Sequence, residues 1–281
     1  MSIWQSIGAT LAGIACMTVS GVVLLVEPLI GTDLTHLTYY VVAMGSSVLV
    51  ATWIRGLPLA RSSFDLRLPD ARSSLLFVLG GVVLLLGLVG PVTSLIPMSD
   101  ADREWFAELI GQTGVATFIA FVIAAPILEE FLFRGVMIDG LLRRYRPWVA
   151  ILVSSTLFGA MHLNSWQFVT GLFFGAFTGW VYFRSRSLVA CVLIHATANG
   201  TGYALRLYAD PESFLPPESP AGGGSSEASV WSDALSSLLT FGVGGGVFAL
   251  CIWALARTLP RHRWPRRVAP AGEGHGSEGA T

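Results

Sequence analysis

Two adjacent acidic residues and an arginine lie inside an otherwise apolar stretch of this 281-residue chain. Residues 126–134 read Pro-Ile-Leu-Glu-Glu-Phe-Leu-Phe-Arg, and the surrounding segment from Val115 to Val136 is long enough to cross a bilayer. An ionised side chain near the middle of a transmembrane helix costs about 2.5–3.5 kcal/mol on insertion scales. This cost has no evident benefit to folding, so Glu129, Glu130 and Arg134 are candidate functional residues.

Glu130 and Arg134 are four residues apart, so they share one helix face and can form an ion pair. Glu129 lies about 100° around the helix from Glu130 and lacks that partner. Pro126 removes an amide donor and tends to kink a helix, and the freed carbonyl groups are tolerated where they are buried in protein or face water. A purely structural ion pair would explain Glu130 and Arg134 but not Glu129.

Histidine and asparagine side chains occur in two later apolar segments. Phe158 and His162 are four residues apart in one segment, and His195 and Asn199 are four apart in the other. A single intramembrane histidine is more often a hydrogen-bonded core residue than a catalyst. Two histidines, an asparagine and an unpaired glutamate in one bundle favour a functional site.

These side chains are the parts needed to hydrolyse an amide. A carboxylate and a neutral imidazole can hold a water molecule between them and activate it without a covalent intermediate. A second imidazole N–H and an amide NH₂ are donors that can stabilise the oxyanion of a tetrahedral intermediate. The sequence contains neither a Gly-x-Ser-x-Gly nor a His-Glu-x-x-His motif. Two glutamates and two histidines could instead bind a divalent metal, but Arg134 would repel the cation and Asn199 would have no role.

The three motifs together resemble a known family. Glu129-Glu130-x-x-x-Arg134, Phe158-x-x-x-His162 and His195-x-x-x-Asn199 are similar to the signature of the CAAX protease and bacteriocin-processing (CPBP, or Abi) family of intramembrane glutamic endopeptidases, which includes the type II CAAX prenyl endopeptidases. The resemblance covers about residues 112–205. It implies an eight-helix fold and a metal-independent reaction without a cofactor.

The resemblance also implies a role for each residue of the motifs. Glu129 and His162 would activate the water, and His195 and Asn199 would form the oxyanion site. Glu130 and Arg134 would hold or tune the first glutamate, with Phe158 in a supporting position.

The rest of the chain supplies helices to position these groups. It is 53% hydrophobic and only 12% charged, far below the roughly 25% charge of a soluble domain. We therefore expect an all-α, polytopic membrane protein. Eight apolar segments are candidate spans, at residues 3–26, 39–54, 74–96, 112–140, 148–163, 166–183, 187–207 and 234–257.

The arginines predict the orientation of this bundle. With the N-terminus inside, fourteen of the seventeen arginines fall in cytoplasmic loops and the C-terminal tail, two fall outside, and Arg134 lies in the membrane. This asymmetry predicts eight spans with both termini inside. Helical rise then places Glu129, His162, His195 and Asn199 near one layer in the middle of the bilayer core. Gly171, Gly175 and Gly179 form a small-x-x-x-small face, which we interpret as a packing surface.

These expectations divide the chain into five parts: N-terminal helices at 1–111, catalytic core helices at 112–207, a flexible extracytoplasmic loop at 208–233, a last span at 234–259, and a disordered cytoplasmic tail at 260–281. Residues 97–111 are expected to be an acidic outer segment. The net charge of −1 gives no indication of a nucleic-acid partner.

The leading interpretation is a peptidase of the bacterial plasma membrane that cuts a membrane-associated or lipidated peptide entering from the inner side or from the lipid. A zinc metalloprotease, a proton-coupled transporter and a non-catalytic immunity or scaffold protein remain as alternatives. The sequence leaves open the substrate and the oligomeric state.

Overall fold

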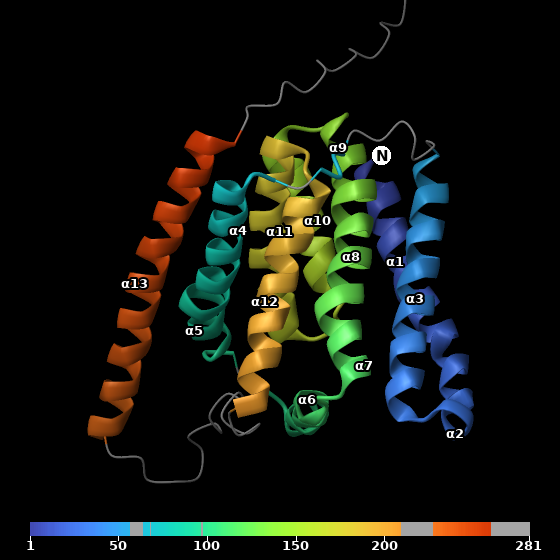
Figure 1. Cartoon of the computed structure of the whole chain (residues 1–281), viewed down its shortest axis with the longest axis horizontal. Helices are drawn as coiled ribbons and strands as arrows, with labels where there is room; N and C mark the ends of the chain where they lie inside the picture. The colour runs from blue at the N-terminus through green and yellow to red at the C-terminus, as the bar shows by residue number, and fades with distance from the viewer. Residues whose placement is uncertain (57–63, 68, 97, 209–226, 260–281) are drawn as a thin grey trace, which may run out of the picture.

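The structure is a computed structural model, and it describes residues 1–56, 64–67, 69–96, 98–208 and 227–259. Within these residues the chain forms helices, with one isolated bridge between Asp65 and Ser187. Most of the helices run side by side across the molecule (Figure 1). Met1 and the end of the last helix lie at one end of the bundle, here called the Met1 end (Figure 1). The all-α membrane fold expected from the sequence is confirmed.

The first two spans form an antiparallel pair. Helix α1 (Ile3–Ser20) begins with a capping box in which Ser2 and Gln5 satisfy each other's backbone N–H groups. It continues through the 3₁₀ segment η1 (Gly21–Val26) and the short α2 (Glu27–Ile30), and α3 (Thr32–Arg55) returns beside it. The prediction that the second span begins at residue 39 was wrong, because the polar residues Thr32, Asp33 and His36 belong to the helix.

The third span leads to a helix that the sequence did not predict. Helix α4 (Ala71–Leu84), the π-helical η3 (Leu85–Val89) and α5 (Gly90–Thr93) form one continuous run. Helix α6 (Asp100–Gly111) follows across the opposite end of the bundle, here called the α6 end (Figure 1). Ser99 caps α6 by accepting a hydrogen bond from the backbone N–H of Asp102. The segment expected to be an acidic outer connection is therefore an ordered helix.

The fourth span carries the two glutamates and departs twice from α-helical geometry. It consists of α7 (Val115–Phe118), the π-helical η4 (Ile119–Ala124), α8 (Ala125–Glu130), the π-helical η5 (Phe131–Ile138) and α9 (Asp139–Leu142). Glu129 and Glu130 therefore lie between two π-helical segments. Such segments occur frequently at functional sites.

Helices α10 (Pro147–Ala160) and α11 (Ser165–Ser185) form a tight hairpin, followed by α12 (Leu188–Tyr208). A Cβ atom placed on Gly171 would lie 2.8 Å from Cα of Gly159, and one on Gly175 would lie 2.8 Å from Cα of Ser155. The predicted small-residue face is thus confirmed as a packing surface, because only glycine permits this approach of α11 to α10.

Six helical runs in the described part of the chain are long and apolar enough to cross a membrane. They correspond to six of the eight predicted spans and begin at Ile3, Thr32, Ala71, Val115, Leu188 and Leu238. The predicted spans 148–163 and 166–183 correspond to α10, which has only 14 residues, and to α11, which has 21 residues but is not among the six. The count of eight and the orientation remain predictions.

The last helix, α13 (Glu227–Thr258), begins earlier than the predicted start at residue 234, so residues 227–233 are helical and not part of a loop. The rest of the predicted loop at 209–226 and the tail at 260–281 lie outside the described residues.

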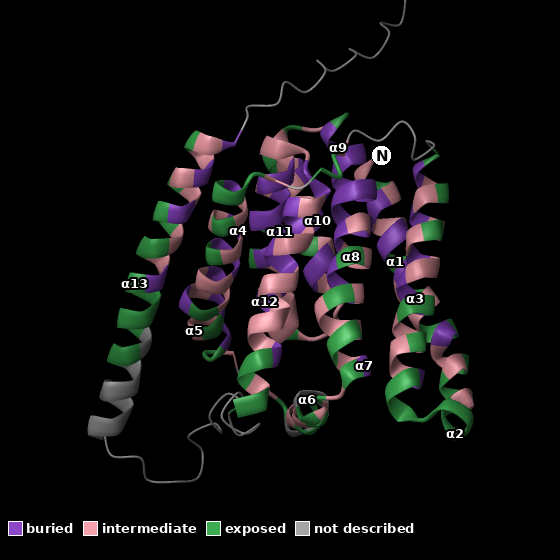
Figure 2. Cartoon of the chain, viewed as in Figure 1, coloured by how far each residue is buried: buried purple, intermediate pink, exposed green. Residues whose placement is uncertain are grey.

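The core lies in the middle of the bundle. Buried residues concentrate on the central helices, whereas α3 and α13 at the two edges carry many exposed residues (Figure 2). The exposed side chains include large apolar ones such as Trp4, Leu49 and Trp53, which are 81%, 72% and 82% exposed. Apolar side chains on the outer surface suit a protein that is surrounded by lipid.

A buried carboxylate joins three elements near the Met1 end. Asp139 is fully buried and lies 2.5 Å from the guanidinium of Arg55, 3.4 Å from that of Arg143 and 3.8 Å from that of Arg186. Tyr182 of α11 also donates a hydrogen bond to Asp139. Arginines that the sequence assigned only to topology therefore also connect α3, α9 and the end of α11.

Candidate active site

Glu130 and Arg134 form the buried ion pair that their spacing predicts. Nε of Arg134 lies 3.0 Å from Oε2 of Glu130, and both side chains are almost completely buried. The guanidinium also lies over the ring of Phe158, 4.9 Å from its centroid. The charge of Arg134 is therefore stabilised by a carboxylate on one side and an aromatic face on another.

His195 of α12 contacts both glutamates. Its Nδ1 lies 2.9 Å from Oε1 of Glu130, and its Nε2 lies 3.8 Å from Oε2 of Glu129. An ionised carboxylate can only accept, so the contact with Glu130 places a proton on Nδ1. The Nε2 atom then faces Glu129 at a distance that is too long for a direct hydrogen bond but allows a bridging water molecule.

Glu129 has a partner that the sequence did not reveal. The hydroxyl of Tyr40 on α3 donates a hydrogen bond of 2.6 Å to Oε1 of Glu129. The predicted second span started at residue 39, which would have left Tyr40 at the membrane surface. Because α3 actually begins at Thr32, Tyr40 lies about two turns inside the helix. If the sequence analysis had started this helix at Thr32, it would have placed Tyr40 inside the bundle, nearer to the level of Glu129.

His162 lies on a turn and not on the helix that was expected to carry it. Helix α10 ends at Ala160, and the backbone of Leu163 adopts a left-handed conformation with φ of 60°. The side chain of Asn164 fixes the turn by donating to the carbonyl of His162. The 14 residues of α10 extend only about 20 Å, which is shorter than the bilayer core of about 30 Å.

The ring of His162 is oriented by the preceding helix. Its Nδ1 lies 3.0 Å from the carbonyl oxygen of Phe158, which can only accept a hydrogen bond. The proton is therefore on Nδ1, and Nε2 of the neutral ring carries a lone pair. The ring of Phe158 makes edge contacts with both histidine rings, at centroid distances of 5.3 Å for His162 and 5.8 Å for His195. Phe158 thus connects the two histidines, although the structure gives no direct hydrogen bond between His162 and Glu129 among the described residues.

Asn199 uses part of its hydrogen-bonding capacity on the backbone of the fourth span. Its Nδ2 donates to the carbonyl oxygen of Phe121 at 2.8 Å. In the π-helical segment the N–H of Ala125 bonds to the carbonyl of Ala120, five residues earlier. The next donor in this pattern would come from Pro126, which has no N–H, so Asn199 supplies the missing donor to Phe121. Among the residues that the structure describes, the second N–H of this amide is left for another acceptor.

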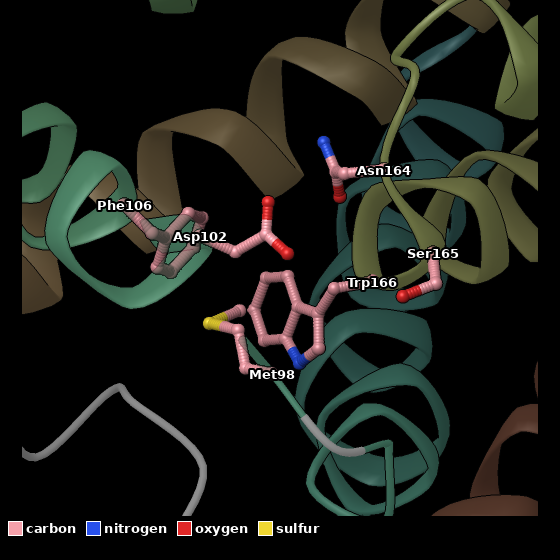
Figure 3. Close-up of a pocket in the computed structure, with 6 residues that line it drawn as sticks. All are labelled: Met98, Asp102, Phe106, Asn164, Ser165 and Trp166. Atoms are coloured by element: carbon pink, nitrogen blue, oxygen red, sulfur yellow. The ribbon is translucent and has the colours of Figure 1, made fainter. Parts of the chain in front are cut away.

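A small cavity lies at the α6 end, next to the turn that carries His162. Its volume is about 10 Å³, near the lower limit for one water molecule. It is lined by Met98, Asp102, Phe106, Asn164, Ser165 and Trp166. The carboxylate of Asp102 and the indole of Trp166 face this cavity (Figure 3). The edge contact between Phe106 and Trp166, at 4.8 Å, fixes α6 against the start of α11.

The described residues contain no cluster of three or more His, Cys, Asp or Glu side chains with an arrangement that could hold a metal ion. The fully buried guanidinium of Arg134 adds a positive charge beside Glu130. A cation would be repelled at this position.

Comparison with known proteins connects this geometry to a family. The family model described as type II CAAX prenyl endopeptidase Rce1-like matches residues 111–201, which contain Glu129, His162, His195 and Asn199. The chain belongs to this Rce1-like family. Membership makes it a CAAX-type intramembrane protease at the level of the family, and the resemblance inferred from the three motifs is confirmed.

A relative from Escherichia coli, named as an uncharacterized 24.3 kDa protein, is 31% identical to this Rce1-like protein over 155 residues. The similarity covers 53% of this chain and 69% of the relative. No solved structure matches the chain.

Proposed function

We propose that this protein is an endopeptidase that hydrolyses a peptide bond of a membrane-associated or lipidated substrate by using a water molecule activated by Glu129 and His162. The observation that carries the proposal is the contact of His195 with both glutamates, within the segment that matches the Rce1-like family. Tyr40 donates to Oε1 of Glu129, and the other carboxylate oxygen, Oε2, lies toward His195.

The reaction follows from the hydrogen-bonding capacity of each group. Glu129 takes a proton from the water while Nε2 of His162 accepts its second hydrogen and orients it. The water oxygen forms a bond to the carbonyl carbon of the peptide, and the C–N bond then breaks. Glu129 returns its proton to the leaving amine. No metal takes part in this mechanism.

The oxyanion of the intermediate is stabilised by donors on α12. His195 donates from Nε2 when that atom carries a proton, while its Nδ1 stays on Glu130. Asn199 donates the N–H that Phe121 does not use. Arg134 compensates the charge of Glu130, which in turn holds His195 in orientation.

The substrate is found first, and the mechanism is then tested on it. Free N-termini of membrane proteins are compared between cells that contain the wild-type protein and cells that contain Glu129→Gln. A terminus present only with the wild type identifies a cleaved protein, and a synthetic peptide across that site is then incubated with purified protein in liposomes. We expect Glu129→Gln and His162→Ala to abolish cleavage, whereas Glu108→Gln, on the exposed face of α6, retains it.

We expect turnover to continue in excess chelator. Two results would contradict the proposal. The first is a loss of activity in chelator that zinc restores, which would indicate a metalloprotease. Cells in which Glu129→Gln has full biological activity and unchanged protein termini would indicate a non-catalytic membrane protein.

A further inference from the structure

Tyr40 reaches the candidate active site from outside the segment that matches the family. It belongs to α3, whereas the match begins at residue 111. The hydrogen bond from its hydroxyl to Oε1 of Glu129, at 2.6 Å, has the length of a charge-assisted O–H···O⁻ bond. Helix α3 packs along the fourth span, so this contact joins two elements that also pack on each other.

We propose that Tyr40 is a positioning residue that holds the Glu129 carboxylate in its reactive orientation, an inference that rests on the proposed function. The last torsion of a glutamate side chain is broad, so an unrestrained carboxylate can rotate. The bond to Tyr40 fixes Oε1 and leaves Oε2 facing Nε2 of His195, at 3.8 Å. Oε2 is therefore the oxygen that accepts the proton of the water.

The neighbouring tyrosine shows what a purely structural hydroxyl does on this helix. The hydroxyl of Tyr39 donates to the backbone carbonyl of Met17 on α1, at 3.2 Å. Any buried hydroxyl needs an acceptor, and such a carbonyl satisfies that need. Tyr40 instead donates to an ionisable group of the site, in a shorter bond. The hydrogen bond of Tyr40 therefore restrains the carboxylate of Glu129 and also gives the hydroxyl an acceptor.

This role assigns a function to the N-terminal helices. The family match contains the glutamates, histidines and asparagine, but the group that orients Glu129 comes from α3. The N-terminal helical pair thus completes the active site, and it does more than anchor the matched core in the membrane.

The test compares Tyr40→Phe with the matched control Tyr39→Phe in the full-length protein in liposomes. The probe is the peptide identified by the comparison of termini. We expect kcat of Tyr40→Phe to fall about 10- to 100-fold with KM unchanged. The substitution removes the hydrogen bond to the reacting carboxylate of Glu129 and changes no group that binds the substrate. Tyr39→Phe is expected to keep wild-type kcat and KM. Equal losses in the two variants would overturn the proposal.

Infrared spectroscopy can detect the hydrogen bond between Tyr40 and Glu129 in the absence of substrate. Carboxyl bands of Glu129 are assigned by their loss in Glu129→Gln, and they should shift in Tyr40→Phe but not in Tyr39→Phe. Unchanged bands in Tyr40→Phe would overturn the positioning role whatever the effect on kcat. If the wild-type protein cleaves nothing, the proposed function fails, whereas the infrared comparison still decides whether Tyr40 holds Glu129.

Discussion

Nδ1 of His195 lies 2.9 Å from Oε1 of Glu130, and the other oxygen of Glu130 pairs with Nε of Arg134 at 3.0 Å. One carboxylate therefore orients the histidine and also neutralises a buried arginine. This geometry supports separate tasks for the two adjacent glutamates under the proposed function: Glu130 would maintain the charge balance and the orientation of the site, and Glu129 would act on the water.

Replacing Glu130 tests this division. Glu130→Gln keeps the size of the side chain but leaves Arg134 buried without its counter-charge, which costs about 3–5 kcal/mol in a typical buried pair. We expect a markedly lower unfolding temperature in detergent, measured by tryptophan fluorescence. Glu108→Gln removes an exposed carboxylate on α6 and should unfold with the wild type. An unchanged unfolding temperature for Glu130→Gln would refute the role of Glu130 in charge balance.

Asn199 and Pro126 should be energetically coupled. Asn199→Leu leaves the partly buried carbonyl of Phe121 without a donor, at a cost of about 1 kcal/mol. Pro126→Ala restores a backbone N–H that can bond to this carbonyl. The loss of stability caused by Asn199→Leu should therefore be smaller in the Pro126→Ala background than in the wild-type background. A double-mutant cycle of unfolding free energies measures the difference, and strictly additive effects would contradict the explanation.

The approach of α11 to α10 depends on the absence of a side chain at Gly171. The Cβ atom of Gly171→Ala would lie 2.8 Å from Cα of Gly159, and the backbone of α10 must move to admit it. We expect a loss of about 1–3 kcal/mol and lower peptidase activity, because the turn that carries His162 joins these helices. Gly202→Ala is the control, since its Cβ atom would have no neighbour within 4 Å. Comparable unfolding of the two variants would argue against the packing constraint.

Asp70 makes a pH-dependent contribution at the start of α4. The hydroxyl and the backbone N–H of Ser73 donate to its carboxylate and lower the pKa of Asp70 below its ordinary value. A lowered pKa in the folded state stabilises the protein above the unfolded pKa of about 3.9, and this contribution is lost as the pH falls through the folded value. Asp70→Ala should thus be less stable than the wild type near neutral pH, and the difference should shrink in acid.

The control for this prediction is Asp70→Asn, which can still cap the helix but does not titrate. Its stability relative to Asp70→Ala should change little with pH. The measurement is the unfolding temperature of the three proteins across the acidic range. A constant difference between Asp70→Ala and the wild type would show that the carboxylate charge has no role at this cap.

The pairing of Glu130 with Arg134 and the packing face of Gly171 and Gly175 were predictable, because both depend on spacing along a single helix. The ends of helices were less predictable. Polar residues at the start of α3 and the acidic residues of α6 resemble loops in composition, yet both segments are helical. The residue at which a helix begins determines which of its side chains lie at the level of the site. Because the second span was predicted to start at residue 39, Tyr40 was not recognised as a partner of Glu129.

The sequence by itself determined the class of protein and the family, since these follow from apolar length, charge and motif spacing. It also predicted the residues that we propose carry the chemistry. Only the tertiary structure decided how the residues contact one another. It placed His195 between the glutamates, gave Glu129 a partner from α3 and directed Asn199 toward Phe121. Periodicity places a residue on the face of its own helix, but the rotation and depth of neighbouring helices come from packing between segments far apart in the chain.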